Sequence, residues 1–226
     1  KTGTTYIDDF ESSKSTVDLT TMSNWVLAST PQGQPDMFPE ARTVSTTDPA
    51  RKQLAYGYNR ARLAWYIIDP LFYNDNNATP SNLTAADLSE PYSRAVYETE
   101  LFPYKQNSTQ ELSTQMSVFN LAYYPTERGP YNYDVNGAEG YSHGINDDGT
   151  LRDPNTRWGG IMRKFDNTDF ESSNYEYIEF WMMDPFMENP NSAGGKLYFN
   201  LGDISEDILR DGVKFFENGL PIDGSD

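Results

Sequence analysis

The sequence feature that most constrains the fold is the block from Asn174 to Phe186, the densest run of strand-forming residues in the chain. Its aromatic and β-branched residues fit a pleated surface, and an Asp-Pro pair ends the run because proline lacks a backbone donor. Side chains alternate between the two faces of a strand. The face predicted to be core consists of Ile178, Phe180 and Met182. The block therefore predicts a central strand, and the similar block from Lys196 to Leu201 predicts its antiparallel partner.

Further strands are predicted where apolar residues alternate between turn-forming segments. These strands are Trp25 to Ser29, Arg60 to Asp69, Ala95 to Phe102, Glu111 to Tyr124 and Trp158 to Phe165. The length of the fourth predicts a bulge or a bend, and the Gly159-Gly160 pair in the fifth predicts a bulge or a close approach of two backbones. The pattern indicates an all-β chain.

Helices are predicted to be short and few. Thr84 and Asp87 have the spacing of a capping box, which predicts one helical turn, and Ser205 is the expected N-cap of a short helix that ends near Phe216. Many short strands with long, turn-rich connections favour a β-sandwich, with a jelly roll as the expected form and a partly open barrel as the alternative.

The length of 226 residues suits one large β domain, and the composition shows no seam within residues 1–226. Long loop excursions are predicted near residues 30–49, 73–91 and 125–153. The last is rich in glycine and proline and has no apolar period. Loops of this length usually bind a ligand or pack on a neighbour, so we expect the same here.

Composition excludes several functional classes. Cysteine is absent, which rules out disulfides and thiolate metal sites, and the formal net charge of −17 disfavours nucleic acid as a partner. Apolar runs are shorter than the ~18 residues that a membrane-spanning helix needs. The 16 tyrosines among many asparagines and serines are typical of an extracytoplasmic β protein whose loops bind protein or carbohydrate.

Chemistry-bearing residues are sparse. Asp8, Asp9 and Glu11 at the end of a short strand are candidate Ca²⁺ ligands, with a solvated turn as the alternative. His143 is the only histidine and is expected to be a solvent-exposed loop residue. A glycosidase needs only two carboxylates, and any chain with 34 acidic residues offers such a pair, so that pattern carries no weight. We therefore predict no catalytic residues and no enzyme.

Two resemblances add to these inferences. Tyr6 to Glu11 and Tyr175 to Trp181 resemble strands of galactose-binding-like jelly-roll modules, in which a structural Ca²⁺ is common and a sugar site is optional. A broader resemblance, to the SprA/Sov family, covers nearly the whole chain. The blocks that carry it are Arg60 to Pro70, Arg128 to Asn132, Trp158 to Arg163, Tyr177 to Phe186, Gly195 to Gly202, Ser205 to Leu209 and Glu217 to Pro221.

The SprA/Sov resemblance implies a fragment of a very large outer-membrane protein of Bacteroidetes, the translocon of the type IX secretion system, which gliding species also require for motility. The chain lacks the repeated alternation of lipid-facing strands, so we expect a cell-envelope segment on the periplasmic or cell-surface side that does not itself span the membrane. Its expected partners are the rest of the translocon barrel and secretion-system proteins.

A non-catalytic scaffold or docking segment is therefore the predicted function. Four aromatic residues are the predicted docking points: Trp65, Tyr131, Tyr141 and Trp158. The alternative is a carbohydrate-binding module with a jelly-roll fold, in which tyrosine or tryptophan rings stack on sugars and carboxylates hold the hydroxyls. A glycosidase is the third class.

Overall fold

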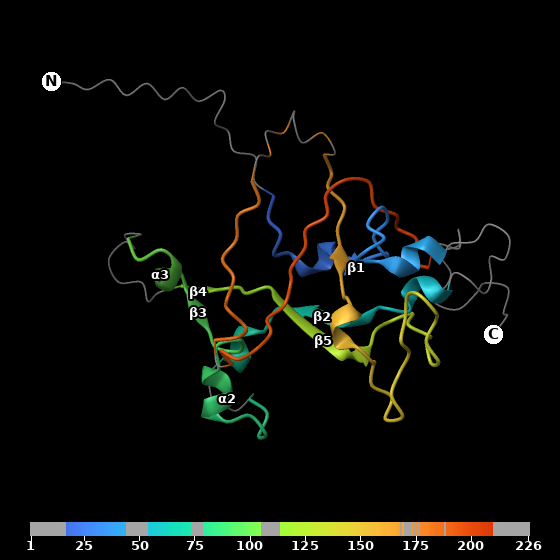
Figure 1. The fold of residues 1–226 in the computed structure, drawn as a ribbon. Helices are drawn as coiled ribbons and strands as arrows, with labels where there is room; N and C mark the ends of the chain where they lie inside the picture. Colours follow the sequence, from blue (N-terminus) through green and yellow to red (C-terminus); the bar gives the residue numbers. More distant parts are fainter. Residues whose placement is uncertain are drawn as a thin grey trace, which may run out of the picture. The chain divides into compact units, whose positions relative to one another are not determined.

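The computed structural model describes residues 17–43, 54–73, 79–104, 114–167, 169, 173, 175, 177–187 and 189–209. Within these residues the fold is mostly β, with small antiparallel sheets and few helices, which confirms the predicted class at this level (Figure 1). The chain forms two compact units. Unit 1 comprises residues 1–21, 68–118 and 164–194, and unit 2 comprises residues 22–67, 119–163 and 195–226. A single domain over residues 1–226 stays a prediction.

The main ladder of unit 2 joins β2 (Ala61–Tyr66) to β5 (Asn120–Arg128), which lie side by side in Figure 1. The pairing is antiparallel, with a register shift between Ala61 and Arg62. Ala61 is buried and Arg62 is exposed, because neighbouring side chains of a strand point to opposite faces. The predicted strand from Arg60 to Asp69 is thus confirmed over most of its length.

A second small sheet of unit 2 pairs β1 (Val26–Leu27) with β6 (Ile161–Met162). Gly159, which lies just before β6, allows close packing against the main ladder. A Cβ on Gly159 would lie 3.0 Å from Leu63 Cβ and 3.2 Å from Tyr123 Cδ2. The approach at Gly159 is therefore to side chains of the main ladder, whereas the prediction was a bulge or a close approach of two backbones.

Short 3-10 turns complete unit 2. They are η1 (Met22–Asn24), η2 (Pro39–Thr43), η3 (Leu54–Gly57) and η5 (Pro154–Thr156). The buried apolar side chains of this unit include Phe38, Tyr56, Ala61, Leu151 and Leu209. Tyr56 and Thr30 fasten the loop after β1 to η3, because each hydroxyl donates to the other residue's carbonyl, at 2.8 and 2.6 Å.

Unit 1 contains a two-stranded sheet and short helices. Its elements are η4 (Pro70–Phe72), α2 (Ala85–Ser89), β3 (Val96–Tyr97), α3 (Glu98–Leu101) and β4 (Gln115–Met116). The predicted capping box is confirmed. Thr84 Oγ1 accepts from the Asp87 amide at 3.2 Å, and the Asp87 carboxylate accepts from the Thr84 amide at 2.7 Å.

The strand predicted from Ala95 to Phe102 is correct only for β3. The chain turns into α3 because Glu100 accepts a hydrogen bond from the Tyr97 amide at 3.0 Å and pairs with Arg94 at 2.8 Å. These contacts hold one helical turn where residue types alone favour a strand. The strand predicted from Glu111 to Tyr124 divides into β4 and β5, and residues 117–119 belong to neither strand.

The predicted central strand is wrong in the described part of its range. Residues 177–187 and 196–201 belong to no strand, and Ile178, Phe180 and Met182 are 43%, 53% and 66% exposed rather than core. Strand propensity describes how well a side chain fits a paired, half-buried surface, and these segments lack that pairing. The predicted helix after Ser205 is absent from residues 205–209, and its remainder lies outside the described residues.

Candidate functional site

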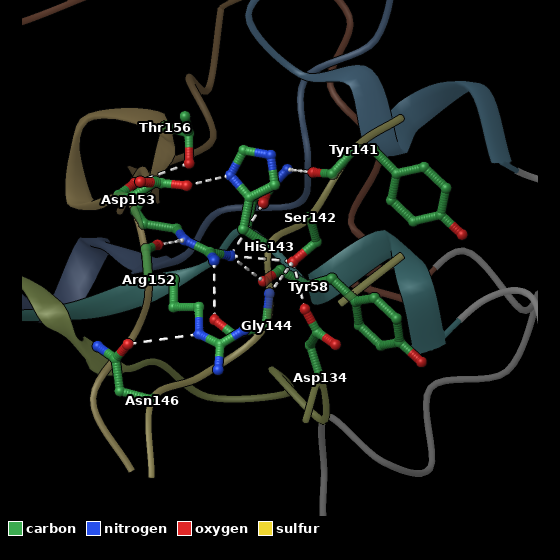
Figure 2. A network of polar contacts seen from close by, with 12 residues as sticks. Tyr58, Asp134, Tyr141, Ser142, His143, Gly144, Asn146, Arg152, Asp153 and Thr156 are labelled. Carbon is green, nitrogen blue, oxygen red and sulfur yellow. Dashed lines mark hydrogen bonds and ion pairs between the residues drawn. The ribbon is translucent and has the colours of Figure 1, made fainter. Parts of the chain in front are cut away.

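Arg157 is the centre of a polar network in unit 2 (Figure 2). It connects the residues just before β2, the 129–153 segment and η5. The side chain is buried, at 6% exposure. Its guanidinium donates to the carbonyls of Tyr58 at 2.9 Å, Gly144 at 3.0 Å and Arg152 at 2.9 Å, and to side-chain oxygens of Asn59 at 3.0 Å and Ser142 at 3.1 Å. One side chain therefore fixes the 129–153 segment to the body of the unit.

Asp134 supplies the negative charge of this network. Its carboxylate accepts from the Ser142 hydroxyl and, at 2.8 Å, from the Gly137 amide. Burial lowers the pKa of the Arg157 guanidinium, and the nearby Asp134 carboxylate acts in the opposite direction. Buried charges require such partners because an unpaired one carries a large desolvation cost. The hydrogen bonds from Gly137 and Ser142 to Asp134 thus connect the turn around Gly137 to the Arg157 network.

A second buried cluster lies around Glu40. Its carboxylate accepts from Asn59 Nδ2 at 2.8 Å and from Trp158 Nε1 at 2.7 Å. Burial raises the pKa of Glu40, while these two hydrogen bonds act against the shift. Asn59 also donates to the Tyr141 carbonyl at 2.5 Å and accepts from Arg157. This amide therefore connects the two clusters.

Arg60 is the cation of the second cluster. It is fully buried, its Nη1 donates to the Ala28 carbonyl, and its guanidinium lies 4.7 Å from the centroid of the Trp158 ring. Burial lowers the pKa of Arg60 to about 10, and the Glu40 carboxylate opposes that shift. The aromatic face partly replaces the water that the guanidinium loses, because the ring attracts a cation.

Tyr58 and Tyr141 form an aromatic pair beside the network. Their ring centroids are 6.4 Å apart, the ring planes differ by 28°, and both residues are half-buried. Figure 2 shows the rings next to each other, with the hydroxyls directed away from Ser142 and Asp134. The backbone carbonyl of each tyrosine accepts a network hydrogen bond, so the scaffold positions both rings. Burial and the Asp134 carboxylate raise the pKa of Tyr58.

His143 pairs with Asp153 and is 60% exposed at its side chain, which confirms the predicted exposed loop histidine. Figure 2 shows the imidazole directed toward Asp153. The neighbouring Ser142 hydroxyl instead donates to Asp134 and accepts from Arg157. A nucleophile relay requires the histidine to take the serine proton. This arrangement differs from that relay, and it holds a loop in place.

The four predicted docking residues lie in different surroundings. Trp65 is a half-buried residue of β2 opposite Leu121, and Tyr131 is half-buried with a left-handed φ of 59°. Tyr141 belongs to the aromatic pair. Trp158 packs edge-on against Phe38, with centroids 5.3 Å apart, and its N–H is bound to Glu40. Trp158 therefore has a clear packing role. The metal-site candidates Asp8, Asp9 and Glu11 lie outside the described residues.

Several residues of this site escape reasoning from sequence. Tyr58, Asp134 and Arg157 stand in segments without a diagnostic motif. Their hydrogen-bond partners are distant in sequence, as the contact between Arg157 and Tyr58 shows. The burial of these charges can therefore be recognised only in the folded structure, where the segments are in contact. The glycine and proline residues of the 125–153 segment predicted a loop. They did not indicate that buried charged side chains hold this loop in place.

Cavities and metal ligands complete the description. A polar cavity of about 350 Å³ is lined by Val135, Asn136, Ile145, Asn146, Asp147 and Arg152. Unit 1 has a smaller cavity of about 120 Å³ beside Tyr73 and Met116. In the described ranges, histidine and carboxylate side chains form no cluster of three or more that could hold a metal ion.

No protein-family model matches the chain, and a search of curated proteins found no significant relative. Of the helices in the described part of the chain, none combines the length and apolar character needed to cross a bilayer.

Proposed function

We propose that the chain is a non-catalytic cell-envelope segment of a type IX outer-membrane translocon similar to SprA/Sov, and that it supports protein export and gliding motility by docking partner proteins. The sequence blocks that resemble this family supply the biological assignment. The observation that supports docking is the Arg157 network, which holds an irregular segment rigidly while Tyr58 and Tyr141 remain half-exposed beside it.

Rigid presentation favours binding because an ordered surface loses less conformational entropy when a partner arrives. Arg157 and Asp134 fix the segment from inside, whereas Tyr133 and Val135 on the same segment are 51% and 53% exposed. Tyrosine provides a large amphipathic contact area at low entropic cost. Taken together, these features are those of a preorganised contact surface.

Unit 1 offers apolar contact area of its own. Tyr177, Trp181 and Met182 are 85%, 70% and 66% exposed, and the Trp181 ring meets Phe102 edge-on with centroids 6.4 Å apart. Exposed apolar side chains grouped in one segment commonly mark interaction sites. The finer fold that we propose is a β-sandwich of the jelly-roll type, similar to galactose-binding-like modules.

In-cell photocrosslinking tests the proposed function. A photoreactive phenylalanine replaces Tyr133 in the parent protein, and the same residue replaces Val26 of β1 in unit 2 as a control of equal exposure, 51%. We expect adducts from position 133 with translocon subunits or exported proteins, identified by mass spectrometry, and fewer from position 26. Equal adducts from positions 133 and 26, or none from position 133 in cells that export normally, would contradict the proposal.

A carbohydrate-binding module is the second candidate function. The polar cavity with Asn136, Asn146, Asp147 and Arg152 favours it, because amide, carboxylate and guanidinium groups can bind sugar hydroxyls. A thermal melt with a panel of polysaccharides distinguishes the two functions. A ligand that binds only the native state raises the melting midpoint, so a sugar-dependent rise would favour this candidate over protein docking.

A further inference from the structure

The Tyr58–Tyr141 pair has unused binding capacity. Neither hydroxyl has a hydrogen-bond partner among the described residues, although both side chains are half-buried. A phenol hydroxyl can both donate and accept a hydrogen bond, so both groups can bind a polar partner. The rings are held from behind by the carbonyl contacts to Asn59 and Arg157, and Figure 2 shows both hydroxyls on the side away from Asp134.

Among the described residues of unit 2, three aromatic rings are in contact with arginine guanidinium groups. Arg60 lies 4.7 Å from the Trp158 centroid, and Arg163 lies 5.7 Å from the Trp25 centroid. At the surface, Arg62 lies 5.0 Å from the Tyr124 centroid and donates to Glu127 at 2.6 Å. A planar guanidinium suits such faces because it can stack on a ring while its edge donates hydrogen bonds. Within the described residues, the Tyr58–Tyr141 pair carries no such cation.

Charge favours a cationic occupant as well. The net charge of the chain is −17, which attracts basic surfaces at long range. Glu139 is exposed in the same turn as Tyr141, and no described residue forms an ion pair with it. The Asp134 carboxylate lies close enough to Tyr58 to influence its ionisation. A ring face, two phenol oxygens and nearby carboxylates together match a guanidinium better than a neutral or acidic group.

We propose that the Tyr58–Tyr141 pair is a docking platform for an arginine side chain on a basic segment of a partner protein. This inference rests on the proposed docking function and names the chemistry of the partner. The guanidinium stacks on one ring and donates to the neighbouring phenol oxygens. Lysine is a poorer occupant, because its ammonium is a compact, strongly hydrated charge without a planar face.

Peptide binding to the purified chain tests this proposal. The probes are a glycine-rich peptide with two arginines and matched peptides with lysine or citrulline, followed by NMR shifts or calorimetry. We expect the arginine peptide to bind most tightly, with affinity that falls as salt increases. Tyr58→Leu together with Tyr141→Leu should weaken its binding about tenfold. Tyr104→Leu, at a tyrosine that is 96% exposed in unit 1, should leave binding unchanged.

A second variant keeps the test valid if the leucine substitutions disturb folding. Tyr58→Phe with Tyr141→Phe retains both rings, so it should weaken arginine binding less than the leucine pair does, by about twofold. Equal binding of the arginine peptide by the wild-type chain and by folded Tyr58 and Tyr141 variants would overturn the proposal. Binding of cellohexaose or chitohexaose that requires the two tyrosines, without arginine binding, would overturn it in favour of a sugar platform.

The two proposals can fail separately. Crosslinks from position 133 to translocon partners, without arginine binding at Tyr58 and Tyr141, would overturn only the arginine platform. Arginine binding that depends on the pair, without crosslinks to any translocon or exported protein, would overturn only the translocon function.

Discussion

Replacing Arg157 with methionine tests the central physical argument about the 129–157 segment. Methionine retains much of the apolar volume but removes every hydrogen bond that the guanidinium makes. It also removes the buried positive charge that interacts electrostatically with the Asp134 carboxylate. Removing one partner of a buried charge pair typically costs about 3–5 kcal/mol in the free energy of unfolding. The individual hydrogen bonds are part of that cost and do not add to it.

Urea unfolding, followed by far-UV circular dichroism and tryptophan fluorescence, measures the loss. Arg62→Met is the matched control, because Arg62 also pairs with a carboxylate, Glu127, but both side chains are about half-exposed. We expect the control to change the free energy of unfolding by only a small fraction of the Arg157 effect, since exposed pairs contribute little.

A double-mutant cycle assigns the effect to the charge pair. Asp134→Asn should cost less in the Arg157→Met background than in the wild type, with a coupling energy of about 0.5–3 kcal/mol. The reasoning is refuted if Arg157→Met is no more destabilising than Arg62→Met. It is also refuted if the effects of Arg157→Met and Asp134→Asn simply add.

Three further predictions concern packing, pH and metal. Gly159→Ala should destabilise the chain by about 1–3 kcal/mol in a thermal melt, because its Cβ would press on Leu63 Cβ at 3.0 Å. The raised pKa of Glu40 means that the folded chain favours the protonated carboxyl. The protonated Glu40 side chain therefore adds to the free energy of unfolding. This contribution is complete below pH 4.5, the usual pKa, and is lost as pH rises through the folded-state pKa. As pH rises above 4.5, the free energy of unfolding of the wild type should therefore fall relative to that of Glu40→Gln, whose side chain does not titrate. Finally, Ca²⁺ should raise the melting midpoint, and Asp9→Asn should diminish the rise.

Each of these has a contrary outcome. An unchanged midpoint for Gly159→Ala would show that the neighbours of this residue can move apart at no cost. Parallel pH profiles for the wild type and Glu40→Gln would contradict the raised pKa of Glu40. A Ca²⁺ effect that is identical in Asp9→Asn, or absent in both proteins, would remove support for the acidic cluster as a metal site.

Local sequence patterns predicted those elements whose partners are near in sequence or strongly patterned. The apolar, strand-forming residues from Arg60 onward predicted β2, and Thr84 and Asp87 predicted the capping box of α2. The Gly159-Gly160 pair predicted a bulge or a close approach of backbones, and at Gly159 the close neighbours are side chains. These features depend on side-chain periodicity, a local hydrogen bond or a missing Cβ, so their information is carried by a few adjacent residues.

The same reasoning failed where pairing decides the outcome. The block from Asn174 to Phe186 has the strongest strand propensity, yet its described residues form no ladder. Conversely, the Ala95 block has strand-forming residues but enters α3, because Glu100 bonds the Tyr97 amide and pairs with Arg94. Strand propensity describes which backbone conformations suit a segment. Whether the segment forms a strand depends on the residues that pair and pack with it in the folded structure.

The sequence by itself determined the mostly-β class, the capping box at Thr84 and Asp87, and the acidic character of the chain. Only the tertiary structure decided that Arg157, Asp134 and Asn59 meet in one buried network, and that Tyr58 lies beside Tyr141. The physical reason is the range of the interactions. Periodicity and capping act over a few residues, whereas a buried charge must find partners from whichever segments the fold brings within hydrogen-bond distance.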